Sequence, residues 1–385
     1  MKKTVYYIPG DGIGPEVYSV SRVVLEEALK KAYGNENSFE WTEILAGEKA
    51  IKETGELLPQ ATLDILKKAE LAIKGPLTTP VGKGFRSLNV TLRQTLDLYA
   101  CIRPVKHIKG VPSPMKRPED VDMVIFRENT EDVYMGIEYQ AGSPEAKRLI
   151  AFLRDELGAK IGDEAAIGIK PMSAFGSQRL IRRAIQYALD NQRPSVTMMH
   201  KGNIMKFTEG GFRAWGYEMA EAEFSDRVIS AEAAKTAGSA GNKLLLKDVI
   251  ADAMFQSAML WPEDFSVIAA PNLNGDYISD ALAAQVGGLG IAPGVNMSDT
   301  LAFFEATHGT APAIAGQDRA NPLSFLLSGV LMLEHLGWNK AAQMIYAAIN
   351  KVVGSKQVTE DLAKQMPGST QVGTKKFGDL LMQAL

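Results

Sequence analysis

The stretch Val5-Tyr6-Tyr7-Ile8-Pro9-Gly10-Asp11-Gly12-Ile13-Gly14-Pro15-Glu16 passes from an apolar run, through three glycines, to a proline. We predict a buried strand over residues 5–8, a tight turn over the glycines and a helix over residues 16–33. Pro15 suits the first position of that helix, where its missing N–H group would have had no partner. The chain therefore opens with a strand, a turn and a helix.

The same arrangement recurs along the chain. Strand-like runs at residues 71–73, 123–126, 196–199 and 267–270 each end at glycine, proline or a polar residue. Near the end of the chain, residues 322–336 and 338–353 have apolar stripes at helical spacing, which predict core helices. Strands that alternate with helices favour an α/β fold with many parallel strand pairs. In open sheets of this kind, ligands bind beyond the carboxyl ends of the strands.

The glycine turn does not predict a Rossmann dinucleotide fold. Its spacing is G-x-G-x-G rather than G-x-G-x-x-G, and no clear strand ends in a ribose-binding acid about 20 residues later. Two interpretations of the turn stay open: a tight strand-to-helix connection, or a loop that faces a cofactor.

Composition and charge narrow the class of protein. The 385 residues are 46% hydrophobic and 23% charged, which is typical of a globular chain of about two domains. The 42 basic and 45 acidic residues are intermixed, so no basic face for nucleic acid is expected. Cys101 is alone, the N-terminus lacks the apolar core of a secretory signal, and no window reaches the roughly 20 apolar residues of a membrane span. We predict a complete cytoplasmic protein that binds a small molecule, not nucleic acid or a membrane.

Four arginines lie close to apolar segments. Arg86 and Arg93 share the window 85–93, and Arg103 and Arg127 stand beside strand-like runs. An arginine there is costly to bury unless a partner offsets its charge, and its guanidinium fork fits a carboxylate. Each one alone is best explained by a structural acid. Three or more that converge on one cleft would indicate a substrate with several carboxylates.

Two pairs of aspartates are spaced four residues apart among apolar residues: Asp248 with Asp252, and Asp276 with Asp280. On a helix the members of such a pair share a face and repel each other. A hard cation that prefers oxygen ligands, Mg²⁺ or Mn²⁺, would relieve that repulsion. An isolated pair is more often a solvated helix face, so the spacing alone leaves both interpretations open.

Tyr134 and Lys201 are further candidates, because a nearby cation can move the pKa of a tyrosine or lysine toward neutrality. Alone, each is more often a packing or surface residue. Glu305 and His308 have the spacing of a zinc-binding pair, but Gly309 predicts a loop there. Only four histidines occur in the whole chain, which also argues against zinc.

Taken together, these segments resemble the isocitrate and isopropylmalate dehydrogenase family along nearly the whole chain. The segments that carry the resemblance are residues 10–15, Ser87-Leu88-Asn89-Val90-Thr91-Leu92-Arg93, Arg127-Glu128-Asn129-Thr130-Glu131-Asp132-Val133-Tyr134, His200-Lys201-Gly202-Asn203-Ile204-Met205-Lys206, Asn272-Leu273-Asn274-Gly275-Asp276-Tyr277-Ile278-Ser279-Asp280 and residues 305–312.

The resemblance implies how a substrate would be bound. Arg93, Arg103 and Arg127 would bind its carboxylates. Ser87 and Asn89 resemble the isocitrate branch of the family, in which they contact the carboxylate that isopropylmalate lacks. The implied substrate is therefore isocitrate.

The resemblance also implies a metal and an acid–base pair. Asp276 and Asp280, with Asp252 from the neighbouring subunit of a homodimer, would bind Mg²⁺ or Mn²⁺. Tyr134 and Lys201 would act as acid and base, Lys201 again reaching across from the neighbour. The implied reaction oxidises isocitrate by hydride transfer and releases CO₂, after which Tyr134 protonates the product 2-oxoglutarate.

The identity of the nicotinamide cofactor is inferred from four positions. NADP-linked relatives that this chain resembles place Lys-Tyr after His-Gly-Thr-Ala-Pro, and Tyr and Arg farther on, to hold the 2′-phosphate. Here these positions read Ala313, Ile314, Glu360 and Lys364, and an acid with two uncharged residues favours NAD over NADP. NAD-linked relatives often carry Asp where Ala313 stands, and Arg319 and Lys364 could still supply positive charge. The resemblance assigns the dinucleotide to Thr79, Asn89, Glu305, His308, Gly309, Ala313, Ile314 and Asn321.

The fold implied by the resemblance has two α/β domains. Residues 1–98 and 287–385 would form a large domain on the cofactor side. Residues 99–131 and 176–286 would form a smaller domain with the substrate, the metal and the dimer interface. Residues 132–175 would form a clasp between subunits.

Three alternative functions share features with this sequence. Homoisocitrate or 3-isopropylmalate could be the substrate of the same chemistry, although Ser87 and Asn89 argue against both. A noncatalytic regulatory subunit of a heteromeric dehydrogenase should have lost the metal aspartates or Tyr134, which this chain keeps. Metal-dependent phosphoryl transfer needs a P-loop or similar cradle, and none is visible. Ser87 could also be a phosphorylation switch, because added negative charge would repel the substrate.

Overall fold

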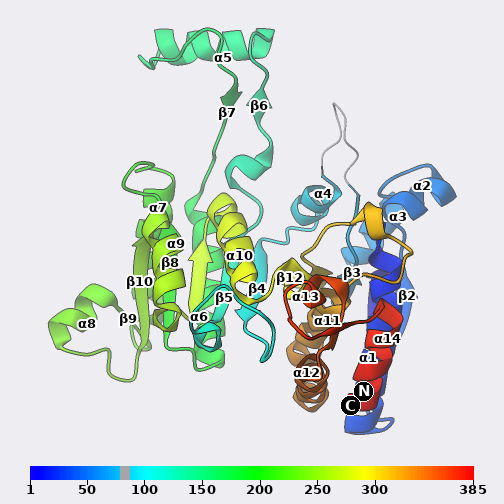
Figure 1. Ribbon diagram of the computed structural model, residues 1–385. Coiled ribbons are helices and arrows are strands. Elements are labelled where there is room, and N and C mark those ends of the chain that lie inside the picture. The colour runs from blue at the N-terminus through cyan, green and yellow to red at the C-terminus, as the bar shows by residue number, and fades with distance from the viewer. Residues whose placement is uncertain (79–86) are drawn as a thin grey trace.

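A computed structural model of the protein describes residues 1–78 and 87–385. Within these ranges, an 11-stranded sheet has the order β2-β1-β3-β13-β12-β4-β5-β11-β8-β10-β9 (Figure 1). Its strands are β1 (Lys2–Ile8), β2 (Ser38–Glu43), β3 (Leu71–Lys74), β4 (Ala100–Lys106), β5 (Asp122–Glu128), β8 (Ser195–His200), β9 (Val228–Ser230), β10 (Leu244–Ile250), β11 (Val267–Ala270), β12 (Pro293–Met297) and β13 (Ala302–Ala306).

Helices connect these strands, and some of them cover the two faces of the sheet. They are α1 (Gly14–Tyr33), α2 (Glu48–Thr54), α3 (Gln60–Leu66), α4 (Leu88–Thr95), α5 (Pro144–Asp155), α6 (Ala174–Asp190), α7 (Glu209–Phe224), α8 (Ala231–Ala237), α9 (Ala251–Leu260), α10 (Asn272–Val286), α11 (Leu323–His335), α12 (Asn339–Gly354), α13 (Glu360–Ala363) and α14 (Thr374–Ala384). A short two-stranded sheet of β14 (Gln357–Val358) and β15 (Thr370–Gln371) flanks α13.

The strands form two parallel sets that run in opposite directions. β2, β1, β3 and β13 pair in parallel, as do β5, β11, β8, β10 and β9. Between the sets, β12 pairs antiparallel with both β13 and β4, and β4 pairs antiparallel with β5. The strands of one set therefore have their carboxyl ends on the side of the sheet where the strands of the other set have their amino ends.

The central strands are buried on both faces. In β5, Val124 and Phe126 pack into the same core as α6 and α7, whereas Met123 and Ile125 pack with α9 and α10 on the other face. Strands covered on both sides have no solvent face, so they read as continuous apolar runs. This explains why β5, β8 and β11 could be predicted from short runs of apolar residues.

The predicted α/β class and the departure from a Rossmann fold are confirmed by the mixed strand directions of the sheet. Each predicted strand is present, with small shifts in its bounds. β2 was not predicted, although Phe39 and Trp41 alternate with polar residues, as is typical of a strand with one solvent-facing side.

The predicted division into domains follows the strand order. Strands from residues 1–98 and 287–385 occupy one side of the sheet, and those from 99–131 and 176–286 occupy the other. The two sides meet where β12 pairs with β4, so one sheet passes through both. The two-domain boundaries stay a prediction.

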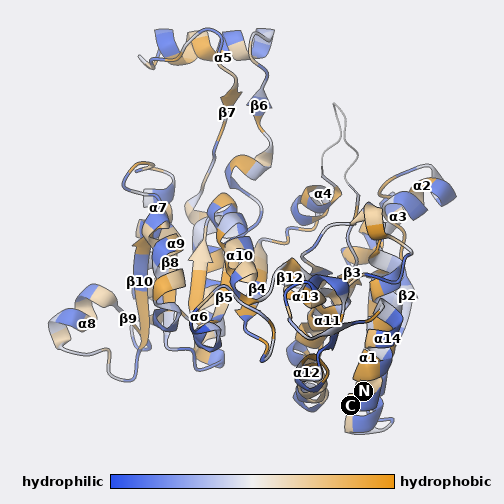
Figure 2. Ribbon diagram, in the orientation of Figure 1, coloured by the Kyte–Doolittle hydropathy of each residue, from blue (hydrophilic) through white to orange (hydrophobic). Residues whose placement is uncertain are grey.

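A two-stranded arm extends from the body within the predicted clasp segment. β6 (Glu138–Tyr139) and β7 (Ile167–Gly168) pair antiparallel and carry α5 away from the main sheet (Figure 1). The colouring of Figure 2 shows hydrophobic residues on α5, and Phe152 of this helix is 54% exposed. In the part of the chain that the structure describes, we find no helix with both the length and the apolar character that crossing a bilayer requires.

We expect Gly75→Ala to destabilise the protein by about 1–3 kcal/mol, the usual cost of overpacking. Gly75 follows β3 where that strand meets the first turn, and a Cβ there would lie 2.1 Å from the carbonyl oxygen of Pro9. Gly162→Ala is the matched control, because a Cβ at Gly162 meets nothing within 4 Å. Urea unfolding of both variants measures the difference, and equal midpoints would contradict the proposed close approach.

Candidate active site

Two arginines from neighbouring strands face two aspartates from one helix. Arg127 of β5 forms an ion pair with Asp276 of α10 and donates to Asn272 Oδ1 from Nε at 3.0 Å and from Nη2 at 2.8 Å. Arg103 of β4 donates to Asp280 Oδ1 at 3.0 Å. Asp276 and Asp280 lie one turn apart on α10, as predicted for a shared helix face.

Close packing of α10 against β5 brings these groups together. Gly275 lies where the helix meets Arg127, and a Cβ there would be 2.7 Å from the Cβ of Arg127. The Arg127 side chain is 1% exposed, so its charge must be offset by the polar groups of α10.

Tyr134 joins this group from the 3₁₀ helix η2 (Asp132–Met135). Its hydroxyl donates to Asp276 Oδ2 at 2.6 Å, and the guanidinium carbon of Arg127 lies 4.7 Å from the centre of its ring. Burial and the Asp276 hydrogen bond raise the pKa of Tyr134, which keeps its proton in place. Burial also acts to raise the pKa of Asp276, but Arg127 and the Tyr134 hydroxyl hold that pKa below its usual range.

Arg93 of α4 completes a group of three guanidiniums. Its Nη2 lies 2.8 Å from Glu305 Oε1 on β13, and Lys74 Nζ of β3 lies 2.7 Å from Glu305 Oε2. Burial, and then the positive charges of Arg93 and Arg103, lower the pKa of Arg127. The three arginines are therefore close enough for their charges to act on one another.

Glu305 is held as a carboxylate in the core. Burial acts to raise its pKa, but Lys74, Arg93 and a hydrogen bond from Asn296 Nδ2 at 2.6 Å hold the pKa far below its usual range. Lys74 was not singled out from the sequence, although it directly follows the strand predicted over residues 71–73, where polar side chains gather in such sheets.

Lys201 and Asp252 form a second group. Lys201 Nζ donates to Asp252 Oδ1 at 2.5 Å, and the two side chains are 31% and 72% exposed. No described contact joins this pair to Asp276 or Asp280, and no cluster of three acids, histidines or cysteines arises within residues 1–78 and 87–385. One chain thus presents two separate parts of the predicted site.

Asp248 and Asp252 do not share a helix. Asp248 belongs to β10, and Asp252 follows in the first turn of α9. Asp248 instead accepts from Tyr217 OH at 2.7 Å and contacts His200 Nε2 and Arg213 Nε at 3.0 Å each. The apolar neighbours that suggested a helix belong to a strand, so the spacing of four does not bring the carboxylates together.

The acids on α10 fit a hard divalent cation. Their donor atoms are carboxylate oxygens, which Mg²⁺ and Mn²⁺ prefer. Burial and then the charge of Asp276 outweigh Arg103 and raise the pKa of Asp280, so further positive charge beside Asp280 would be favourable.

Two residues assigned to the isocitrate branch lie at the start of α4. Ser87 is the residue before the first helical position, and Asn89 lies in the first turn. Asn89 Oδ1 is buried without a hydrogen-bond partner, so it is available to a ligand donor. Thr79 and Arg86 lie outside the described residues.

Several of the predicted cofactor residues line one pocket of about 290 Å³. Its walls include His308, Ile314 and Asn321, with Arg319 and Lys364 at the same pocket. Burial lowers the pKa of His308, whose Nδ1 contacts the carbonyl oxygen of Gly309 at 2.9 Å. A carbonyl can only accept, so Nδ1 carries the proton, and the buried Nε2 has no partner. Ala313 lies beside Ile314 in the 3₁₀ helix η5 (Pro312–Ile314).

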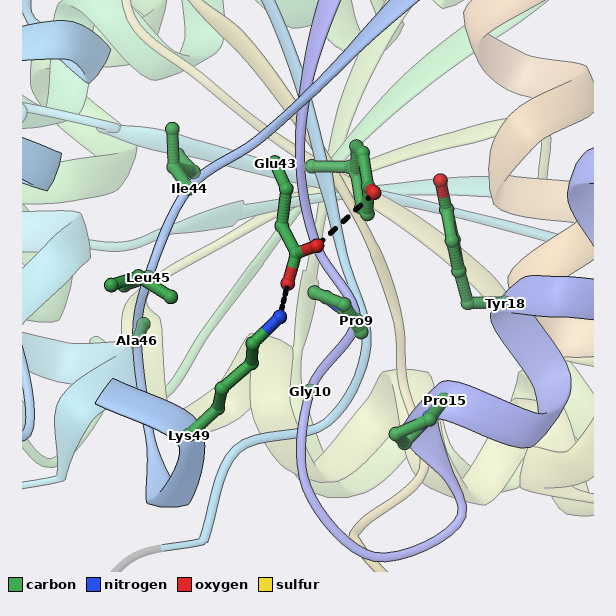
Figure 3. Close-up of a pocket in the computed structure, with 10 residues that line it drawn as sticks. Pro9, Gly10, Pro15, Tyr18, Glu43, Ile44, Leu45, Ala46 and Lys49 are labelled. Carbon is green, nitrogen blue, oxygen red and sulfur yellow. Dashed lines mark hydrogen bonds and ion pairs between the residues drawn. The ribbon is translucent and has the colours of Figure 1, made fainter. Parts of the chain in front are cut away.

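A second cavity, of about 340 Å³, lies beside the first glycine turn (Figure 3). Its polar side chains satisfy one another: Tyr7 OH donates to Glu43 Oε2 at 3.3 Å, and Lys49 pairs with the same carboxylate. The cavity therefore presents apolar walls and no unpaired charge, and we assign it no ligand.

The comparison with known proteins identifies the family. A model described as isocitrate/isopropylmalate dehydrogenase matches residues 4–381. The chain belongs to this family. The resemblance inferred from the segments at 87–93, 127–134, 200–206 and 272–280 is confirmed.

Members of the isocitrate/isopropylmalate dehydrogenase family resemble the chain over nearly its whole length. A Staphylococcus aureus protein named isocitrate dehydrogenase (NADP) is 53% identical over 98% of this chain and 94% of its own length. A Coxiella burnetii protein of the same name is 55% identical over 98% of this chain and 90% of its own length. The crystal structure of isocitrate dehydrogenase from Methylococcus capsulatus, 36% identical, superposes with a TM-score of 0.80 and covers 99% of each chain.

The preference for NAD inferred from the sequence is wrong, because these relatives are named for NADP. The contacts of Glu360 give a physical reason for the error. Its carboxylate accepts from Arg319 at 2.6 and 2.8 Å and lies 2.8 Å from Lys364 Nζ, so two cations offset its charge. Asp361 in the same pocket accepts from Asn321 Nδ2 at 2.9 Å. An acid in the sequence therefore does not mark an electronegative pocket here.

We expect Glu305→Gln to lower the free energy of unfolding by about 3–5 kcal/mol near neutral pH, because Lys74 and Arg93 would stay buried without their counter-charge. The folded-state pKa of Glu305 is depressed, so its contribution is complete above the ordinary glutamate pKa and falls as the pH drops below it. The difference from the wild type should therefore shrink in acid. Chemical unfolding between neutral and acidic pH measures it, with exposed Glu221→Gln as the control. A loss independent of pH would contradict the assignment.

Proposed function

We propose that the protein oxidises isocitrate to 2-oxoglutarate and CO₂ and passes the hydride to NADP. The observation that carries this proposal is the pairing of Arg103 and Arg127 with the two aspartates of α10, with Arg93 close enough for its charge to act on Arg127. Membership of the isocitrate/isopropylmalate dehydrogenase family and the names of the relatives support the same reaction.

The arginine group suits a substrate with three carboxylates. Guanidiniums bind carboxylates through paired hydrogen bonds, and a bound trianion would relieve the mutual repulsion of the three arginines. In this proposal Ser87 and Asn89, at the start of α4, contact the third carboxylate. They would separate isocitrate from substrates that carry a different group at that position.

Asp276 and Asp280 would hold Mg²⁺ or Mn²⁺ together with Asp252 of the partner subunit. When bound, the cation supplies Lewis-acid stabilisation of negative charge on the substrate oxygens. Arg127 and Tyr134 hold the carboxylate of Asp276 in place through direct contacts. This fixes one oxygen donor before any ligand binds.

Lys201 and Tyr134 would divide the proton transfers. Lys201 takes the proton of the substrate hydroxyl while the hydride leaves the carbon that bears this hydroxyl. After CO₂ departs, Tyr134 donates its hydroxyl proton to the carbon that carried the lost carboxylate. Arg127 beside the Tyr134 ring then stabilises the resulting tyrosinate.

NADP would bind in the pocket lined by His308, Ile314 and Asn321. Gly309, Ala313, Glu305, Asn89 and Thr79 are the other residues proposed for cofactor binding. Arg319 and Lys364 would supply positive charge for the 2′-phosphate, because phosphate is bound well by both guanidinium and ammonium groups.

A homodimer would bring the two parts of the site together. Large apolar side chains are exposed on the segments that carry Lys201 and Asp252. Ile204 and Phe207, which follow Lys201, are 70% and 92% exposed, and Trp261, at the far end of α9 from Asp252, is 48% exposed. Exposed apolar groups of this size are typical of protein interfaces. The arm of α5, β6 and β7 would contribute the clasp. The cytoplasmic location and the absence of nucleic-acid partners stay predictions from the sequence.

Initial rates of the purified protein with Mg²⁺ test the reaction. We expect reduction of NADP with isocitrate, at a higher kcat/KM than with NAD. Homoisocitrate and 3-isopropylmalate should react more slowly. Homoisocitrate carries its third carboxylate one carbon farther from the contacts of Ser87 and Asn89, and 3-isopropylmalate lacks that carboxylate. Faster turnover of either would replace isocitrate as the substrate, and no reduced cofactor with any of the three would favour a noncatalytic subunit.

We expect Tyr134→Phe and Lys201→Met each to lower kcat by about 10²-fold or more, the usual scale of acid–base catalysis, with little change in isocitrate binding. A mixed dimer tests whether the site is shared. If one subunit carries Tyr134→Phe and the other Lys201→Met, one of the two sites keeps both wild-type residues.

That mixed dimer should recover about half of the wild-type turnover, since one of its two composite sites is intact. The two homodimeric variants are the controls. A mixed dimer as inactive as its parents would show that both residues act within one chain.

A further inference from the structure

The backbone of Lys201 is held by a buried acid. Glu209, the first residue of α7, is 0% exposed, and its Oε2 accepts from the N–H group of Lys201. The same oxygen accepts from Asn274 Nδ2 at 2.8 Å. Asn274 lies two residues before Asp276 on α10, so one carboxylate joins the Lys201 loop to the helix of the proposed metal ligands.

A lysine connects this acid to the segment that carries Tyr134. Lys170 Nζ lies 2.8 Å from Glu209 Oε1 and donates to Asp132 Oδ1 at 2.7 Å. Asp132 is 1% exposed and is the first residue of η2, two residues before Tyr134. Its other oxygen accepts from the N–H group of Leu273 on α10 at 3.1 Å.

Asp132 also has a strained backbone that these contacts hold. Its φ of +69° is unusual for a residue with a side chain. Its side chain accepts from the next N–H group, that of Val133, at 2.7 Å, and its own N–H group donates to the carbonyl oxygen of Pro171 at 2.9 Å. Pro171, the residue after Lys170, therefore also helps to fix the start of η2.

The charges of this network depend on Lys170. Asp132 and Glu209 are both buried, and each lies within 3 Å of the same ammonium group. Without that charge, the two buried carboxylates would repel each other, and both Asp132 and Glu209 would lose their ion pair with Lys170. Both segments, the loop of Lys201 and the helix η2, would then be free to shift.

We propose that Asp132, Lys170 and Glu209 form a positioning network that sets Lys201 and Tyr134 for catalysis. The inference rests on the proposed function, in which the Lys201 of each chain serves the site of its partner. Tyr134 serves the site of its own chain, so the network joins the two active sites of the dimer. Lys170 and Glu209 contact neither the three arginines of the site nor Asp280. They would therefore affect the placement of Lys201 and Tyr134 rather than the binding of the substrate.

Lys170→Met tests the network by removing the charge while keeping a similar length. A displacement of about 1 Å can cost about 10²-fold in rate, so we expect kcat to fall about 10-fold to 100-fold. The KM for isocitrate should change less than about threefold, because the arginines that bind it are untouched. Lys170→Arg keeps the charge and should restore most of kcat. Ile345→Val, in the core between α12 and its neighbours, is the control for a general loss of stability.

Hydrogen–deuterium exchange gives a readout that does not depend on activity. In Lys170→Met, amides in residues 131–135 and 200–206 should exchange about tenfold faster, while those in α12 stay unchanged. Faster exchange throughout the protein, or in neither segment, would overturn the proposal. If the wild type does not oxidise isocitrate, the proposed function fails, and the exchange data alone still decide whether the network positions the two segments.

The mixed dimer tests the connection between sites. Its intact site uses Tyr134 of the Lys201→Met subunit and Lys201 of the Tyr134→Phe subunit. Lys170→Met added to either subunit should lower kcat, because the network supports Tyr134 in one and Lys201 in the other. Loss of turnover from only one of the two additions would show that the network does not join the sites.

Discussion

The ion pair between Arg127 and Asp276 is the contact on which the rest of the site depends. Arg127 is buried in the central sheet, where a guanidinium is costly without partners, and α10 supplies them through Asp276 and Asn272. Gly275 allows the helix to come close enough, because no side chain lies between it and Arg127. Once α10 is docked in this way, Asp280 lies beside Arg103, Asp276 meets Tyr134, and Asn274 meets Glu209.

The balance of charge around this contact explains how a chain with a net charge of −3 would bind the trianion proposed as its substrate. Arg93 is shared with Glu305, and Arg103 and Arg127 are shared with the aspartates of α10. Each acid therefore stabilises an arginine without the ligand and leaves part of its positive charge for the ligand. A divalent cation would take over the acids, and substrate carboxylates would take over the guanidiniums. The two ligands should thus favour each other.

Much of the fold could be predicted because the strands buried on both faces are continuous apolar runs. The edge strand β2 was missed, although the alternation of Phe39 and Trp41 with polar residues is itself a strand signal. The spacing of Asp276 and Asp280 correctly indicated a helix face. The same spacing misled at Asp248 and Asp252, because a strand ends between them.

Properties that depend on contacts between residues far apart in the chain could not be predicted from the sequence. In the sequence alone, the negative charge of Glu360 indicates repulsion of a phosphate. In the structure, Arg319 and Lys364 both pair with this carboxylate and offset its charge. Lys170 and Glu209 carry no motif, and their importance follows only from the residues they contact. The roles proposed for Tyr134 and Lys201 come from the resemblance to a family, because no local pattern could have suggested them.

The most direct test of this account is the anomalous diffraction of Mn²⁺ in crystals grown with isocitrate. We predict one strong peak within bonding distance of Asp276 and Asp280, with Asp252 of the partner subunit as the third carboxylate ligand and the substrate facing Arg93, Arg103 and Arg127. A peak bound by other residues, or isocitrate bound away from these arginines, would contradict it.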